Sequence, residues 1–156
     1  MMRLWRLSAH ARFDAQGARR FGGRWNPAGV SVIYTAATLA LATLELLVHV
    51  DRELVPRHAV AHYVDAPDDV PVERLDAARL PTGWQRYPAP EALQEIGLRW
   101  VSAAKSLLLA VPSSVLRVPI DLTPGERNYL VNPAHPDFAR LRVRSVRIAL
   151  DPRMWR

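Results

Sequence analysis

The alternation of apolar and polar residues near the start of the chain predicts two β-strands. Residues 1–7, MMRLWRL, alternate around Leu4 and Arg6, and residues 30–36, VSVIYTA, are rich in β-branched side chains. Both patterns are typical of strands. On the first strand Arg6 is expected to leave the sheet on one face, and on the second Tyr34 lies close to the strand end.

Two later segments have the patterns of helices. Thr38 is suited to cap a helix that runs through LALATLELLVHV to about Val50. Leucines and valines surround the axis of this helix, so it is predicted to be largely buried, with Glu45 as its one interior charge. Pro90, at a first helical position, predicts a second helix. The apolar stripe of that helix comprises Leu93, Ile96, Trp100 and Ala104.

The order of these elements predicts an α+β domain with a compact mixed sheet. Strands and helices alternate irregularly, unlike the regular βαβα order of a doubly wound sheet or barrel. At 156 residues and without a linker, the chain is expected to form a single domain, residues 1–156. Further strands are predicted at residues 57–64, 106–111, 114–120 and 140–150, with a turn-rich segment at 123–138.

Composition narrows the possible chemistry. The chain has no cysteine, which excludes disulfides, a thiol nucleophile and cysteine-ligated metal. The five histidines are scattered, and no carboxylate follows the closest pair, His58 and His62, at ligand spacing, so no metal site is expected. No stretch has the length of a membrane span and the N-terminus lacks the apolar run of a signal peptide, which predicts a cytoplasmic protein without membrane contact.

The net charge of +6 and pI near 10.7 point toward a polyanionic partner. Lys105 is the only lysine, so the charge reflects an arginine bias along the whole chain and is weak support for nucleic-acid binding. The best nucleic-acid candidate is the run Arg140, Arg142, Arg144 and Arg147. A solvated strand edge is the commoner explanation, and no aromatic residue interleaves to stack bases, so direct nucleic-acid binding is not expected.

Glu45 is the first candidate for chemistry, because a carboxylate among apolar residues is costly unless it is paired or lines a pocket. A structural ion pair with an arginine is the alternative. Arg24 lies in GGRWN, where it is either an anion clamp on a flexible backbone or a solvated arginine in a turn. Ser113, in VPSSVL, lacks the elbow of a nucleophilic serine, which favours a positioning role.

Five segments taken in order resemble the RES-domain family, toxins of bacterial type II toxin–antitoxin systems. They are LWRLS, GGRWNPAGVSVIYTA, ATLELLVHV, VPSSVLRVP and NYLVNPAHPDF, and they span nearly the whole chain. The family is named for an arginine, a glutamate and a serine, and the last two correspond to Glu45 and Ser113. Arg6 and Arg24 both stand in family-like segments. We expect Arg24 to be the main phosphate contact and Arg6 the second.

The resemblance implies a fold similar to ADP-ribosyltransferase toxins, with NAD+ as substrate and no cofactor or metal. It implies cleavage of the nicotinamide–ribose bond by hydrolysis or phosphorolysis, or transfer of ADP-ribose to a protein, so that the acceptor is water, phosphate or a protein. The implied partner is an Xre-type antitoxin that occupies the cleft. Toxins of this family pair through their antitoxins, so a dimer within the complex is implied. The implied catalytic residues are Glu45, Arg24 and Ser113, and the implied NAD+ contacts are Arg6, Arg24, Asn26, Tyr34 and Ser113.

A carboxylate in a low-dielectric pocket suits this chemistry, because it stabilises an oxocarbenium-like state. The glycines at Gly22 and Gly23 are expected to let the phosphates approach the backbone. Two other classes remain open: a nucleic-acid-binding protein that uses the Arg140–Arg147 strand, and a catalytically inactive relative that acts only as a binding partner.

Overall fold

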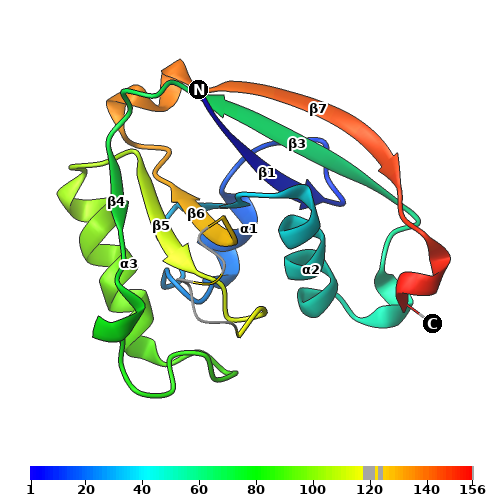
Figure 1. Ribbon diagram of the computed structural model, residues 1–156, viewed down its shortest axis with the longest axis horizontal. Coiled ribbons are helices and arrows are strands. Elements are labelled where there is room, and N and C mark those ends of the chain that lie inside the picture. Colours follow the sequence, from blue (N-terminus) through cyan, green and yellow to red (C-terminus); the bar gives the residue numbers. More distant parts are fainter. Residues whose placement is uncertain (118–121, 123–124, 156) are drawn as a thin grey trace.

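The structure is a computed structural model that describes residues 1–117, 122 and 125–155. Within these residues it contains seven β-strands and three α-helices (Figure 1). In chain order they are β1 Met2–Ser8, α1 Gln16–Phe21, β2 Ile33–Ala36, α2 Leu39–His49, β3 His58–Ala66, β4 Val72–Arg74, α3 Glu91–Ala103, β5 Leu108–Pro112, β6 Arg127–Val131 and β7 Arg142–Ala149.

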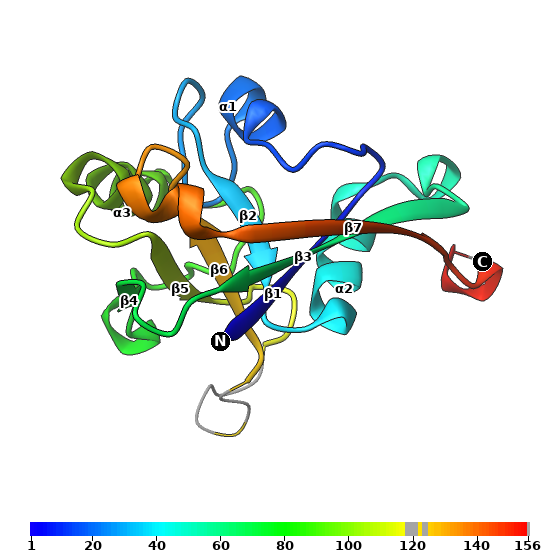
Figure 2. The same ribbon diagram turned by 90° about the horizontal axis from the view of Figure 1, so that it is seen from above.

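The strands form one sheet in the order β4-β5-β6-β2-β1-β3-β7. All neighbouring strands are antiparallel except β4 and β5, which are parallel. The long strands β3 and β7 run across the view in Figure 2, whereas β2 and β6 run steeply to them, so the sheet is strongly twisted. This mixed sheet with helices confirms the predicted α+β class.

Two helices cover one face of the sheet at different strands. On α3, Leu93 and Trp100 pack with Leu109 of β5 and Leu130 of β6, while on α2 Leu41 packs against β1, β2 and β3. The opposite face holds a third apolar cluster that includes Leu4, Ile33, Val64, Leu108 and Val131. Figure 1 shows that α2 and α3 cover separate parts of the sheet.

The sheet opens between β1 and β2. These strands are joined in register only at Trp5 and Ala36, whereas β1 and β3 pair along seven positions from Met2 to Ser8. Arg6 therefore follows the residue of β1 that pairs with β2, at the point where β1 and β2 diverge. Where two neighbouring strands separate, a cleft can form between them that both strands line.

Most predicted elements are confirmed, with boundaries shifted by one to three residues. Thr38 caps α2, accepting a hydrogen bond from the Leu41 amide at 3.1 Å, as its sequence position predicted. The strand predicted at 114–120 is not observed over 114–117, and residues 118–120 lie outside the described residues. Short α1 and β4 were missed, and the segment at 123–138 contains β6 in addition to turns. In the described part of the chain, no helix has the length and apolarity needed to cross a bilayer.

The prediction that the helix now labelled α2 is largely buried is wrong. Only Leu41 and Ala42 of this helix are buried, while Leu44 is 37% and Val48 58% exposed. The helix packs on the sheet along one side only. Its other sides face solvent and the pocket described below. Glu45 is therefore only partly buried, on the side that looks into the cleft.

A buried histidine makes stability depend on pH. His62 of β3 has no exposed surface, with Nδ1 2.7 Å from the Ser145 hydroxyl and Nε2 3.1 Å from the His10 carbonyl. Burial lowers the pKa of His62 below its ordinary value of 6.5. The unfolded chain therefore binds this proton more readily than the folded chain, and folding stability falls as pH drops below about 6.5.

We expect urea unfolding midpoints to decrease between about pH 7 and pH 5, and His62→Gln to remove part of that slope. His58→Gln is the matched control, because His58 is an exposed residue of the same strand. Equal slopes for the wild-type protein and His62→Gln would show that His62 is not the group responsible.

Candidate functional site

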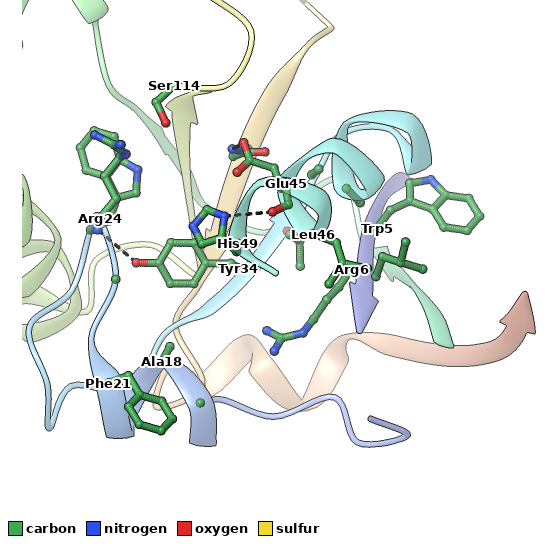
Figure 3. Close-up of a pocket in the computed structure, with 18 of the residues that line it drawn as sticks. Trp5, Arg6, Ala18, Phe21, Arg24, Tyr34, Glu45, Leu46, His49 and Ser114 are labelled. Atoms are coloured by element: carbon green, nitrogen blue, oxygen red, sulfur yellow. Dashed lines mark hydrogen bonds between the residues drawn. The ribbon is translucent and has the colours of Figure 1, made fainter. Parts of the chain in front are cut away.

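A pocket of about 520 Å³ lies where β1 and β2 diverge, bounded by α1 and α2 (Figure 3). Its volume falls within the range of about 300–1,000 Å³ found for small-molecule sites. The lining is mostly apolar, with a few polar groups that face one another. The polar side chains that matter below are Arg6, Arg24, Tyr34, Glu45, His49 and Asn128.

The carboxylate of Glu45 is held by two neutral donors. Its Oε1 accepts a hydrogen bond from the Ser113 hydroxyl at 3.0 Å and from Asn128 Nδ2 at 2.6 Å. Among the described residues Glu45 forms no salt bridge, so the structural ion pair considered from the sequence is not observed there. No described residue donates to Oε2. The carboxylate is thus oriented through one oxygen, and the other is left for a ligand.

Ser113 supports Glu45 and does not line the pocket. The side chain is 5% exposed, and besides donating to Glu45 its Oγ accepts from the amides of Val115 at 3.1 Å and Leu116 at 3.3 Å. The neighbouring Ser114 lines the pocket instead. This geometry suits the positioning role inferred from the sequence, and the direct contact of Ser113 with NAD+ stays a prediction.

Asn128, the second donor to Glu45, was missed by sequence reasoning. It is the second residue of β6 and pairs with Ala36 of β2 and Val111 of β5, which fixes its backbone at the floor of the pocket. The sequence predicted a turn-rich segment at 123–138, which contains Asn128. The apolar run Tyr129–Val131, with an aromatic and a β-branched residue, was the signal that could have revealed a strand.

Arg6 is a half-buried cation to which the described part of the chain offers no partner. It lines the pocket from β1, and its guanidinium forms no hydrogen bond or ion pair with any described residue. Burial lowers the pKa of Arg6, an effect opposed by the charge of Asp14. Taking a guanidinium partly out of water is costly without a counter-charge, so this position favours an anionic ligand.

Arg24 is engaged by the backbone of a distant loop. Its Nη1 donates to the Trp84 carbonyl at 2.5 Å and its Nη2 to the Arg86 carbonyl at 3.1 Å. Burial lowers the pKa of Arg24, and the negative charge of Glu45 acts against this. Both arginines line the pocket, and no described residue bonds the Arg6 guanidinium, whereas Arg24 donates to two carbonyls. Which of the two is the main phosphate contact stays a prediction.

Tyr34 and Asn26 build the wall of the pocket behind these arginines. The Tyr34 hydroxyl donates to Asn26 Oδ1 at 2.6 Å and accepts from the Trp25 amide at 3.0 Å, and burial raises the pKa of Tyr34. The Asn26 amide donates to the carbonyls of Ala18 and Val30. Tyr34 lines the pocket, whereas Asn26 has no exposed surface and is not among the lining residues, so its contact with NAD+ stays a prediction.

The two glycines of GGRWN line the pocket, and the local structure also requires glycine at both positions. Gly22 follows α1 with φ of +73°, a conformation that other residues adopt at a cost. A Cβ at Gly23 would lie 2.5 Å from the Tyr34 hydroxyl. The turn therefore needs both glycines to close around Tyr34, whether or not phosphates approach them.

Two further lining residues were not singled out from the sequence. His49, one helical turn after Glu45, has Nδ1 2.9 Å from the Glu45 carbonyl oxygen. Phe21, at the end of α1, is 76% exposed and lines the same pocket. The spacing of Glu45 and His49, four residues apart on a helix, was the signal that places both on one face.

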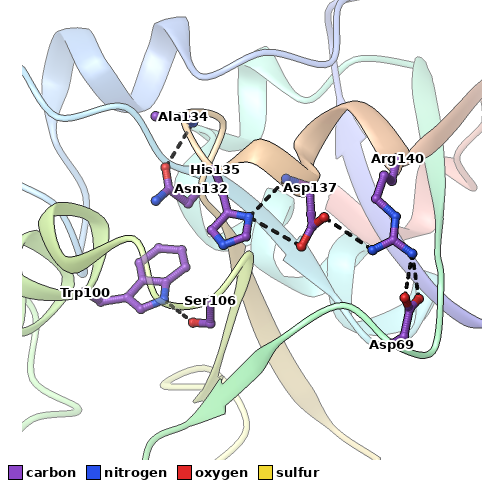
Figure 4. Close-up of polar contacts among 8 residues, drawn as sticks. All are labelled: Asp69, Trp100, Ser106, Asn132, Ala134, His135, Asp137 and Arg140. Carbon is purple, nitrogen blue, oxygen red and sulfur yellow. Dashed lines mark hydrogen bonds and ion pairs between the residues drawn. The ribbon is translucent and has the colours of Figure 1, made fainter.

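The motif VNPAHPDF lies outside the pocket and builds the turn after β6 (Figure 4). Asn132, fully buried, donates to the Val101 carbonyl and accepts from the Ala134 amide. His135 Nδ1 accepts from the Asp137 amide at 3.1 Å. These hydrogen bonds hold the turn in place. The residues of the motif therefore have a structural role, and none of them lines the pocket.

The arginine run at the C-terminus is only partly available to a polyanion. Arg140 precedes β7 and binds both carboxylate oxygens of Asp69 at 2.7 Å, with Asp137 at 3.2 Å (Figure 4). Asp65 lies across from Arg142, and the charges of Arg142 and Arg144 help to lower its pKa. This exposed edge strand fits a charged, solvated edge better than a nucleic-acid site.

Comparisons with known proteins place the chain in a family. The RES domain matches residues 3–152. The "Prs ADP-ribosylating toxin" of Sphingobium sp. (strain YBL2) is 37% identical, covering 97% of this chain and 96% of the relative. "Toxin Res" proteins of Pseudomonas putida and Yersinia enterocolitica are each 35% identical, covering 99% and 88% of this chain and 100% and 87% of the relatives.

Among solved structures, a chain of the M. tuberculosis MbcT-MbcA toxin-antitoxin complex has a similar fold, with a TM-score of 0.73 at 20% identity. The likeness covers 98% of this chain and 86% of that chain. At this identity it supports the fold alone. The match of the RES domain to nearly the whole chain, together with relatives that align over almost their full length, shows that the protein belongs to the RES-domain family.

Proposed function

We propose that the protein is the toxin of a toxin–antitoxin pair and that it cleaves the bond between nicotinamide and ribose in NAD+. The observation that carries the proposal is the Glu45 carboxylate, fixed by Ser113 and Asn128 in a pocket that is also lined by Arg6, for which the described residues supply no partner. The names of its relatives, "Toxin Res" and "Prs ADP-ribosylating toxin", support the same class of activity.

The fixed carboxylate suits the transition state of this cleavage. When the C1′–N bond breaks, its electron pair stays on nicotinamide and positive charge develops on the ribose ring. A negative charge that is already oriented stabilises that cation without reorganising. Oε2 of Glu45, to which no described residue donates, is the atom we assign to this role, because Oε1 already accepts two hydrogen bonds.

The remaining polar groups suit the rest of a dinucleotide. We assign the pyrophosphate to Arg6, whose guanidinium has the planar fork that binds phosphate oxygens in pairs. Arg24 contributes a second positive charge and ties the 84–86 segment to the pocket. Tyr34 and the exposed Phe21 present aromatic surface to nicotinamide or adenine rings.

The direct test is to incubate the purified protein with NAD+ and to quantify nicotinamide, ADP-ribose and phosphorylated ADP-ribose, with and without inorganic phosphate. ADP-ribose in both samples indicates hydrolysis, and a phosphate-dependent product indicates phosphorolysis. Intact NAD+ in both samples, with cell-extract proteins left unlabelled by NAD+ carrying a tagged adenine, would refute the proposed cleavage.

Transfer of ADP-ribose to a protein is the second candidate, favoured by the relative that is named an ADP-ribosylating toxin. It uses the same bond cleavage and differs only in the acceptor. The labelling arm of the same experiment separates it from hydrolysis.

We further propose that an Xre-type antitoxin neutralises the protein by occupying this pocket, since the fold is shared with a chain of a toxin-antitoxin complex.

Asn128 provides a prediction on how Glu45 is held. We expect Asn128→Ala to lower kcat for nicotinamide release roughly 10- to 100-fold, because a hydrogen bond to a charged group is lost, with little change in KM. Asn128→Asp is expected to be worse, since it replaces the donor with a second negative charge beside Glu45. Steady-state kinetics that show unchanged kcat in Asn128→Ala would rule out this role.

A further inference from the structure

We propose that His49 accepts the proton that an oxygen nucleophile loses when it captures the ribosyl group of NAD+. The inference rests on the proposed function, because it assigns the step that follows cleavage of the nicotinamide–ribose bond. His49 lies on α2 one turn after Glu45, and both residues line the same pocket. Figure 3 shows the imidazole of His49 projecting from the helix between Glu45 and Tyr34.

The hydrogen bond of His49 sets which ring nitrogen is free. Nδ1 lies 2.9 Å from the backbone carbonyl oxygen of Glu45, and a carbonyl oxygen can only accept. Nδ1 therefore carries the hydrogen, and in the neutral ring Nε2 carries the lone pair. No described residue hydrogen-bonds Nε2, so this lone pair is available to a molecule in the pocket.

Glu45 is less suited to take this proton. Its charge is needed on the developing ribosyl cation, and a protonated carboxyl group would lose that stabilisation. Its Oε1 is also already engaged by Ser113 and Asn128. A separate base one helical turn away lets the site keep its negative charge while the nucleophile is deprotonated.

With water as the acceptor, the step balances without a further reactant. The C1′–N bond breaks and its electron pair remains on nicotinamide. A lone pair of the water oxygen forms the new C1′–O bond, and one proton of that water moves to Nε2 of His49. The products are nicotinamide, ADP-ribose and a protonated His49, which returns its proton to solvent.

The alternative role of His49 is structural, since a histidine in the last turn of a helix can stabilise that turn by hydrogen-bonding a backbone carbonyl. His49→Asn separates the two roles. The Asn side-chain amide keeps a donor near the place of Nδ1 for the Glu45 carbonyl, but it has no basic nitrogen. His58→Asn is the matched control, because His58 is an exposed histidine on β3 that does not line the pocket.

The experiment compares nicotinamide release by the wild-type protein, His49→Asn and His58→Asn, in water and with saturating sodium azide. We expect kcat of His49→Asn to fall about 100-fold in water with KM nearly unchanged, and His58→Asn to match the wild type. Azide is an anion with no proton to lose. With azide as acceptor, the defect of His49→Asn should therefore shrink to within about threefold of the wild type.

Two results would overturn the inference. Turnover of His49→Asn in water within about twofold of the wild type would show that no base is needed at this position. An equal loss of activity with water and with azide would show that His49 only supports the helix. Absence of nicotinamide release by the wild-type protein is a different failure, because it refutes the proposed function itself.

Discussion

Glu45→Gln is expected to reduce NAD+ cleavage about 1,000-fold while leaving the fold intact. The substitution keeps the shape of the side chain and an oxygen that can accept from Ser113 and Asn128, so the hydrogen bonds at Oε1 are retained. Only the negative charge is lost. Because that charge acts on the transition state more than on bound NAD+, the loss should appear in kcat, with KM changing little.

The measurement is steady-state nicotinamide release, together with growth of cells after induction of each variant. Glu91→Gln is the matched control, since Glu91 is an exposed carboxylate at the start of α3. We expect cells to tolerate Glu45→Gln and to arrest with the wild-type protein and Glu91→Gln. Activity of Glu45→Gln above about a tenth of the wild type would mean that the carboxylate does not carry the chemistry.

Local pattern predicted the elements that have strong local signals. The alternation in residues 1–7 gave β1, and the Thr38 cap gave the start of α2. Glu45 could be singled out because burying a carboxylate among leucines costs free energy unless the carboxylate is paired or lines a pocket. In each case the residues themselves carry the information, so no knowledge of the fold was needed.

The arrangement of the site depends on contacts between distant segments, which no local pattern encodes. Asn128 reaches Glu45 across 83 positions of the sequence because β6 pairs with β2. Arg24 meets the carbonyls of Trp84 and Arg86 across 60 and 62 positions. From the sequence alone, a glycine-flanked arginine is either an anion clamp or a solvated arginine in a turn, and only the fold reveals that two of its donors bind backbone carbonyls.

Arg6→Ala is expected to raise KM for NAD+ by about 10- to 100-fold without destabilising the fold. The guanidinium has no described protein partner, so its removal breaks no hydrogen bond and relieves the cost of a partly buried charge. Thermal unfolding of Arg6→Ala should therefore occur at or above the wild-type temperature. Arg6→Lys should bind NAD+ with intermediate affinity, because it keeps the charge but not the fork.

The contrasting variant is Arg24→Ala. It removes the bonds to the carbonyls of Trp84 and Arg86, so we expect roughly 1–3 kcal/mol of destabilisation and a smaller rise in KM than for Arg6→Ala. Arg3→Ala serves as the control, since Arg3 is an exposed arginine of β1 that pairs with Asp65 outside the pocket. If Arg24→Ala instead raised KM more than Arg6→Ala at unchanged thermal stability, the pyrophosphate would belong to Arg24, and its bonds to the 84–86 segment would have to break when NAD+ binds.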